Sequence, residues 1–168
     1  DRTKGGVYRS TDRGESWKKM SNTVSGGTGP HYYQELYTSP HEFDRLYLMN
    51  VHILTSKDGG KNFEQLTNER NFYYYFDKKH SDHHAMAFKQ SDPDYLMVGT
   101  DAGIYESFDD AKNWHYFLNL PLTQFYKVAV NNKEPFYHIF GGTQDNGSAG
   151  GPSATDEEYG ITNRVWYK

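Results

Sequence analysis

The sequence predicts an all-β protein built from repeated units of four short antiparallel strands. Aromatic residues make up 17% of the 168 residues, with 15 Tyr and 10 Phe, and there are 16 Gly. Aromatic side chains favour strands and glycines favour tight turns, whereas disordered chains are poor in aromatic residues. In addition, one octapeptide recurs three times, each time directly after a strand-like stretch. Composition and repeat therefore indicate the same fold class.

The octapeptide reads STDRGESW at 10–17, SKDGGKNF at 56–63 and SFDDAKNW at 107–114, with Ala111 where the other copies have Gly. An Asp side chain can accept hydrogen bonds from the backbone of its own loop, and Gly adopts positive φ, so the pattern predicts a hairpin turn. The final aromatic residue is expected to begin the returning strand and to fill the space between neighbouring sheets. We assign a structural role to Ser10, Asp12, Gly14, Trp17, Ser56, Asp58, Gly60, Phe63, Ser107, Asp109 and Trp114.

A second element repeats in phase with the octapeptide. Polar, Pro-containing turns followed by a strand occur at 39–48, 91–98 and 131–140, and another strand precedes each of them. Four strands in about 50 residues make one blade of a β-propeller. We expect the end of a blade in 1–20, full blades in 34–66 and 84–117, the start of a blade in 126–148 and an irregular tail in 149–168.

These segments amount to about 3.5 blades, whereas propellers typically close with 4–8. We therefore expect the chain to be part of a larger propeller, completed by further sequence or by another chain.

The octapeptide resembles the Asp-box of the BNR repeat, which is found in sialidases, sortilin-type receptors and xyloglucanase-like glycosidases. The strings DHHA at 82–85, GTDAGIYES at 99–107 and GGTQDNGS at 141–148 resemble bacterial sortilin-like and xyloglucanase-like propellers commonly labelled glycosyl hydrolases. The resemblance implies a propeller whose octapeptide turns are structural and whose functional groups lie on the opposite face. It also implies a secreted, periplasmic or cell-surface protein.

Composition excludes several other classes. There are 18 Lys and Arg against 22 Asp and Glu, a net charge of −4, and no basic block, which argues against a nucleic-acid partner. No apolar run approaches the roughly 18 residues of a membrane span. The chain has no Cys, which excludes disulfides, thiol catalysis and Cys-ligated metals. We expect no cofactor.

The face opposite the octapeptides carries the candidate functional residues. Asp82, Asp101 and Asp145 are the candidate catalytic carboxylates, expected to converge from adjacent blades, because glycoside hydrolysis uses two carboxyl groups roughly 5–9.5 Å apart. Asp101 and Asp145 are equally typical of ordinary turns. The candidate binding residues are His31, Tyr33, His52, Arg70, Tyr73, Tyr74, Tyr75, His80, His83, His84, Gln144 and Asn146.

Two clusters stand out within this set. The histidines of 80–84 suit a divalent metal or a general acid–base pair, but one imidazole packed in the interior with the others solvated explains them as well. Strand alternation would direct His83 and His84 to opposite faces. The aromatic run 72–76 suits stacking on sugar rings, or burial in a strand or an interface. Arg70 beside it is a candidate carboxylate anchor.

Three functional hypotheses follow. The first is a glycoside-hydrolase-like propeller that acts on a polysaccharide. The second is a sortilin-like propeller that binds a peptide or glycan without chemistry. The third is a scaffold segment of a larger assembly.

Overall fold

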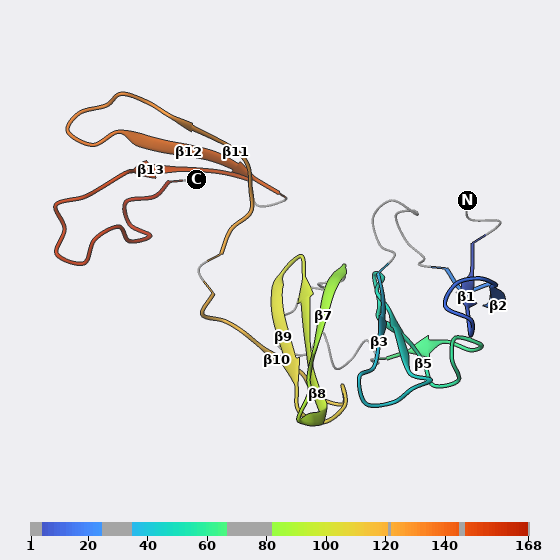
Figure 1. Cartoon of the computed structure of the whole chain (residues 1–168). Coiled ribbons are helices and arrows are strands. Elements are labelled where there is room, and N and C mark those ends of the chain that lie inside the picture. Colours follow the sequence, from blue (N-terminus) through green and yellow to red (C-terminus); the bar gives the residue numbers. More distant parts are fainter. Residues whose placement is uncertain (1–4, 25–34, 67–81, 121, 145–146, 168) are drawn as a thin grey trace. The chain divides into compact units, whose positions relative to one another are not determined.

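The computed structural model describes residues 5–24, 35–66, 82–120, 122–144 and 147–167. All regular secondary-structure elements in these residues are β-strands, and every strand pair is antiparallel. The predicted all-β fold of antiparallel propeller blades is therefore confirmed. The chain divides into two compact units, Asp1–Asn119 and Leu120–Lys168 (Figure 1). The described residues contain no helix long and apolar enough to cross a membrane.

The first unit contains three sheets, whose strands pair in sequence order. The first consists of β1 (Val7–Arg9) and β2 (Lys18–Ser21); the second of β3 (Leu36–Thr38), β4 (Leu46–Leu48), β5 (Leu54–Ser56) and β6 (Glu64–Gln65); the third of β7 (His83–Lys89), β8 (Asp92–Thr100), β9 (Gly103–Ser107) and β10 (His115–Tyr116). Each of the two four-stranded sheets is a meander in which an octapeptide connects the last two strands.

The second unit contains β11 (Phe125–Val130), β12 (His138–Thr143) and β13 (Ser148–Pro152). The irregular tail predicted from residue 149 is wrong at its start, because β13 runs to Pro152. The end of this tail also joins the sheet, because Tyr167 and Gly150 exchange two backbone hydrogen bonds of 2.9 Å. Tyr167 therefore lies where a fourth strand would be. β13 could not be predicted from the sequence, because the glycines at 150 and 151 leave no alternation of hydrophobic and polar residues. The positions where their side chains would project are filled by Phe140, Tyr167 and Trp166.

The three octapeptide turns share one hydrogen-bond pattern. In each turn the serine hydroxyl donates to the aspartate, at 2.7, 2.8 and 2.9 Å for Ser10, Ser56 and Ser107, and accepts from the backbone N–H four residues later. The aspartate accepts from the backbone N–H four residues on and from the side chain of that residue, which is Ser16, Asn62 or Asn113.

The pKa of all three turn carboxyls is lowered; at Asp109 burial opposes the shift, but the hydrogen bonds from Asn113 and Ser107 outweigh it. The pKa of Asp12 is lowered to about 2, mainly by the hydrogen bond from the Ser16 hydroxyl. The pKa of Asp58 is also lowered to about 2, mainly by the hydrogen bond from the Asn62 backbone N–H. Ala111 adopts a φ of 64°, so the third turn keeps the left-handed conformation without glycine. The predicted packing of the final aromatic residue differs between copies: Trp114 is buried, but Trp17 is 63% exposed and donates from Nε1 to the Gly14 carbonyl.

The core of the first unit lies between the two four-stranded sheets. From β3–β6 and its loops it takes Tyr47, Met49 and Ile53; from β7–β10 and its octapeptide it takes Met86, Leu96, Val98, Tyr105, Ala111 and Trp114. The register aligns Met86, Val98 and Tyr105 across three strands on one face. Because these residues belong to the shared core, this face contacts the preceding sheet. Tyr47 and Phe88 pack across the interface with ring centroids 5.4 Å apart.

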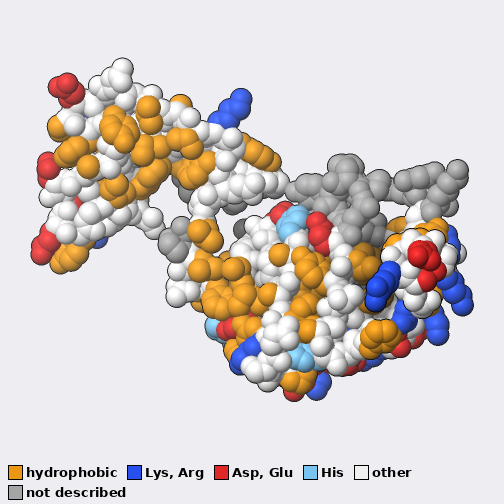
Figure 2. All heavy atoms as spheres, in the orientation of Figure 1, with side chains coloured by type: hydrophobic (Ala, Val, Ile, Leu, Met, Phe, Trp, Pro, Cys, Tyr) orange, Lys and Arg blue, Asp and Glu red, His pale blue; other side chains and the backbone are white. Residues whose placement is uncertain are grey.

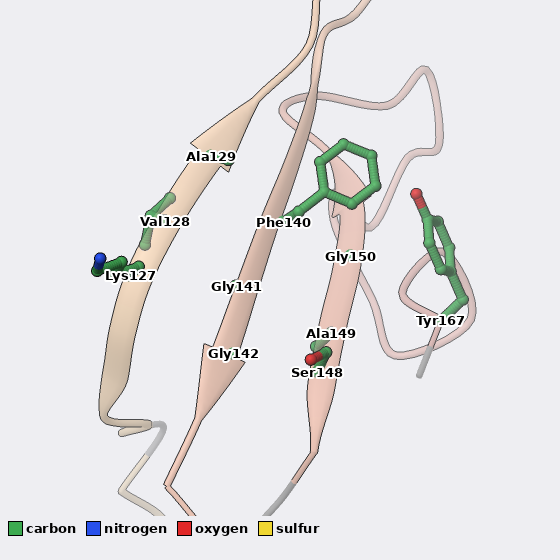
Figure 3. Close-up of a pocket in the computed structure, with 10 residues that line it drawn as sticks. All are labelled: Lys127, Val128, Ala129, Phe140, Gly141, Gly142, Ser148, Ala149, Gly150 and Tyr167. Atoms are coloured by element: carbon green, nitrogen blue, oxygen red, sulfur yellow. The ribbon is translucent and has the colours of Figure 1, made fainter.

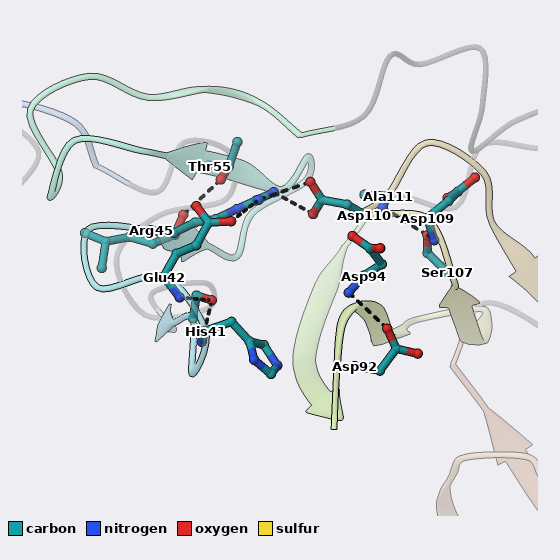
Figure 4. Close-up of polar contacts among 12 residues, drawn as sticks. His41, Glu42, Arg45, Thr55, Asp92, Asp94, Ser107, Asp109, Asp110 and Ala111 are labelled. Atoms are coloured by element: carbon teal, nitrogen blue, oxygen red, sulfur yellow. Dashed lines mark hydrogen bonds and ion pairs between the residues drawn. The ribbon is translucent and has the colours of Figure 1, made fainter. Parts of the chain in front are cut away.

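A partly buried ion pair reinforces this interface (Figure 4). Nη1 and Nη2 of Arg45, directly before β4, donate to the two carboxylate oxygens of Asp110 at 3.0 and 2.7 Å. The guanidinium carbon also lies 5.2 Å from the centre of the Tyr47 ring. Asp110 belongs to the octapeptide of the next sheet and has a φ of 55°. The turn thus supplies a carboxylate that binds the neighbouring blade.

Candidate functional site

The candidate site lies at the end of β7–β10 away from its octapeptide. In this sheet Leu96 pairs with Ser107 at the octapeptide end, whereas Thr100 pairs with both Gly103 and His83 at the other end. Asp82 directly precedes β7, and Asp101 directly follows β8. The two aspartates are therefore neighbours, and the Asp101 N–H donates to the Asp82 carbonyl at 3.2 Å. The expectation that they come from adjacent blades is wrong, because they flank strands of the same sheet.

His83 is a packing residue between sheets. It is 3% exposed, and its ring Nδ1–H donates to the Asn50 carbonyl at 3.1 Å, in the loop between β4 and β5. Its backbone N–H donates to the same carbonyl, also at 3.1 Å. Burial lowers the pKa of His83, and nearby His52 acts in the same direction, so the ring is held neutral. The structure thus gives this candidate binding residue an interior position.

His84 points to the opposite side of the strand and forms the main polar pair of the site. Its Nε2–H donates to Oδ1 of Asp101 at 2.6 Å, and both side chains are more than one-third exposed. The hydrogen bond fixes the ring orientation and, in the neutral ring, makes Nδ1 the acceptor nitrogen. An imidazole oriented by a carboxylate can accept or deliver a proton, or bind a hydroxyl group. The opposite orientations expected for His83 and His84 are observed.

The backbone around the two aspartates is held in a defined conformation. Asp82 has a φ of 73°, which is uncommon for a residue other than glycine. Such a conformation persists where the surrounding structure holds the backbone in place. Its N–H donates to the Val51 carbonyl at 3.4 Å. In the turn after β8, the Tyr116 hydroxyl donates to the Ala102 carbonyl at 2.6 Å, and the Thr100 hydroxyl accepts from the Ala102 N–H at 3.1 Å. Asp101 is therefore presented on a braced turn.

Two residues that brace this site were not predicted from the sequence. Asn50 accepts both His83 hydrogen bonds, and its side-chain oxygen also accepts from the Val51 N–H at 2.7 Å. Tyr116 fixes the turn that carries Asp101. Neither residue belongs to a motif, and their roles depend on pairings between distant positions.

The remaining candidates are distributed as follows. His52 lies half-buried in the loop between β4 and β5, and Gln144 directly follows β12 in the second unit. The other predicted site residues lie outside the described residues: His31, Tyr33, Arg70, Tyr73, Tyr74, Tyr75, His80, Asp145 and Asn146. Within the described part of the chain, no group of three or more His, Asp or Glu side chains is arranged to hold a metal ion.

The chain is similar to known proteins in structure but not in sequence. No protein-family model matches the chain, and a search of curated proteins finds no match. A GH74 xyloglucanase from Xanthomonas campestris is 15% identical, with a TM-score of 0.46, over 86% of this chain and 24% of the xyloglucanase. YCF48 bound to a D1 peptide is 14% identical, with a TM-score of 0.43, over 82% and 41%. An ancestral GH74 enzyme is 13% identical, with a TM-score of 0.39, over 88% and 27%.

The chain thus spans less than half the length of each of these structures. At such identities the likeness concerns the fold alone.

Proposed function

We propose that the chain forms part of a carbohydrate-active propeller whose site is the end of β7–β10 that carries Asp82, His84 and Asp101. The observation that carries the proposal is the 2.6 Å hydrogen bond between His84 and Asp101, beside a second aspartate whose backbone carbonyl binds Asp101. Carboxylates and imidazoles bind sugar hydroxyl groups, and paired carboxyl groups perform glycoside hydrolysis. The proposal includes a secreted, periplasmic or cell-surface location, which is what the resemblance of the octapeptide implies.

The octapeptide turns support the same assignment from the other end of the blade. Their Ser–Asp hydrogen bonds are local and repeat in three copies, as a structural Asp-box of a BNR-type propeller would. Functional groups are then expected at the opposite end, where the loops differ from blade to blade. In hydrolysis, Asp82 and Asp101 would be the two carboxyl groups, and His84 would hold Asp101 in position.

A propeller that binds a glycan or peptide without chemistry is the second candidate. Asp101 is already engaged by His84, an arrangement that suits a fixed acceptor for ligand hydroxyl or N–H groups as well as it suits a catalytic group.

One experiment tests the proposal and separates the two candidates. A glycan array with the 168-residue chain would identify ligands, and reducing-end release would then be measured on those that bind. Asp82→Asn and Asp101→Asn should each weaken binding by about tenfold or more, and Asp92→Asn, at the octapeptide end of the same sheet, serves as the control. Release of reducing ends supports hydrolysis, and binding without release supports the second candidate. Affinities all weaker than about 1 mM, or equal effects of the three variants, would refute the site.

A further inference from the structure

An exposed groove covers one face of β11–β13 (Figure 3). It has a volume of about 530 Å³, and the rings of Phe140 and Tyr167 stand beside a floor that contains Gly142 and Gly150. Their ring centroids lie 6.3 Å apart. Figure 2 shows hydrophobic side chains gathered on this unit, and Phe140 is 37% exposed.

Strand register identifies the equivalent face in the first unit. In β11–β13 the register aligns Ala129, Phe140, Gly150 and Tyr167 across the sheet. In β3–β6 it aligns Tyr37, Tyr47, Thr55 and Glu64 in the same way. We call these the Phe140 face and the Tyr47 face. Phe140 thus occupies the position of Tyr47.

The register match is supported by two further details. β7 and β11 both have a bulge after their first pair, with His83 opposite Thr100 and Phe125 opposite Thr143. Both threonines also donate from the hydroxyl to a glycine carbonyl at the next turn, at 3.2 and 2.9 Å. β12 therefore aligns with β8 and, through it, with β4.

The Tyr47 face is covered within the chain, and the residues that cover it are known. Tyr47 is 2% exposed, and the opposing face of β7–β10 contributes Tyr105 and Trp114, which are 6% and 9% exposed. Tyr105 lies two residues before the turn serine Ser107, and Trp114 lies seven residues after it. We call this covering surface the Tyr105 face.

β1–β2 presents the same pair of aromatic residues to solvent. Relative to Ser10, Tyr8 and Trp17 occupy the positions of Tyr105 and Trp114. Val7 contacts β3–β6 at Gly60, so alternation directs Tyr8 to the other side of the strand. Tyr8 is 44% exposed and Trp17 is 63% exposed. We call this the Tyr8 face.

We propose that the Phe140 face binds the Tyr8 face of a second copy of this chain, head to tail, in the way that β3–β6 binds β7–β10. A second copy fits this face because the aromatic pair that covers the Tyr47 face recurs, exposed, on β1–β2. Such a contact is heterologous, so each copy contributes a different face.

The test is sedimentation velocity of the 168-residue chain over a range of concentrations, with circular dichroism to verify folding. Wild type is expected to associate. Trp17→Ala removes the Tyr8 face, and Ala129→Glu places a charge on an exposed strand position of the Phe140 face. Each variant should weaken association by about tenfold or more, whereas Tyr159→Ala, at an 85% exposed tyrosine that belongs to neither face, should leave it unchanged.

Mixing gives the decisive observation. Trp17→Ala retains an intact Phe140 face and Ala129→Glu an intact Tyr8 face, so an equimolar mixture should form a dimer that neither variant forms alone. A monomer at all wild-type concentrations would overturn the proposal. Failure of the mixture to associate, or association that survives both substitutions, would also overturn it.

Discussion

Breaking the ion pair between Arg45 and Asp110 should destabilise the first unit far more than breaking an exposed pair. The Arg45 side chain is 7% exposed and that of Asp110 is 27% exposed. Removing one partner of a buried ion pair typically costs about 3–5 kcal/mol, because the other charge remains buried. Glu42 still contacts Arg45 at 3.2 Å, and an asparagine oxygen would keep one hydrogen bond. We therefore expect Asp110→Asn to lower the free energy of unfolding by about 2 kcal/mol.

Asp44→Asn is the matched control. Asp44 accepts from Arg9 at 2.8 Å, also between neighbouring sheets, but the two side chains are 50% and 34% exposed. Solvent screens such a pair, so its loss should cost about 0.5 kcal/mol or less. Asparagine tolerates the positive φ of Asp110, so backbone strain does not distort the comparison.

Urea denaturation followed by tryptophan fluorescence measures both variants, because Trp114 lies in the core at this interface. On an Arg45→Met background, which removes the buried charge, Asp110→Asn should cost less than about 0.5 kcal/mol. Equal losses for Asp110→Asn and Asp44→Asn, or an undiminished loss on the Arg45→Met background, would refute the assignment of the stability to this ion pair.

Four further predictions concern pH and the turns. The lowered pKa of His83 means that the unfolded chain binds its proton first, so stability should fall as pH drops below 6.5; thermal melts should show a flatter profile for His83→Gln. The pKa values of about 2 at Asp12 and Asp58 add stability that is present above pH 3.8 and lost toward pH 2; melts of Asp58→Asn should lack part of this acid loss. Gly60→Ala should cost about 2 kcal/mol in urea denaturation, because its φ is 90° and the new methyl would lie 2.8 Å from Val7. Ala111→Gly should change stability by less than about 0.5 kcal/mol, because relief of positive φ offsets the loss of a buried methyl; a larger loss would show that the third turn is not strained.

The sequence predicted features whose physical cause is local. Each octapeptide contains its own hydrogen-bond donors and acceptors within eight residues, so its turn could be recognised without knowing the rest of the fold. The blade pattern followed from the spacing of these turns. β13 was missed because its glycines are packed by Phe140, Tyr167 and Trp166, which are distant in sequence. The interactions of the site depend on similar separations: 17 residues between His84 and Asp101, and 33 between His83 and Asn50.

Adjacent residues at the start of β7 connect blade packing to the candidate site. His83 binds the loop of the preceding sheet, while His84, on the other side of the strand, binds Asp101. Protonation or replacement of His83 would disturb the backbone that positions His84, so acid sensitivity of ligand binding can arise at a residue that touches no ligand. The two origins are separable, because His83→Gln should flatten the pH dependence of stability, whereas Asp101→Asn should weaken binding while leaving that dependence in place. A change in binding counts as evidence for the site when stability at the same pH is unchanged.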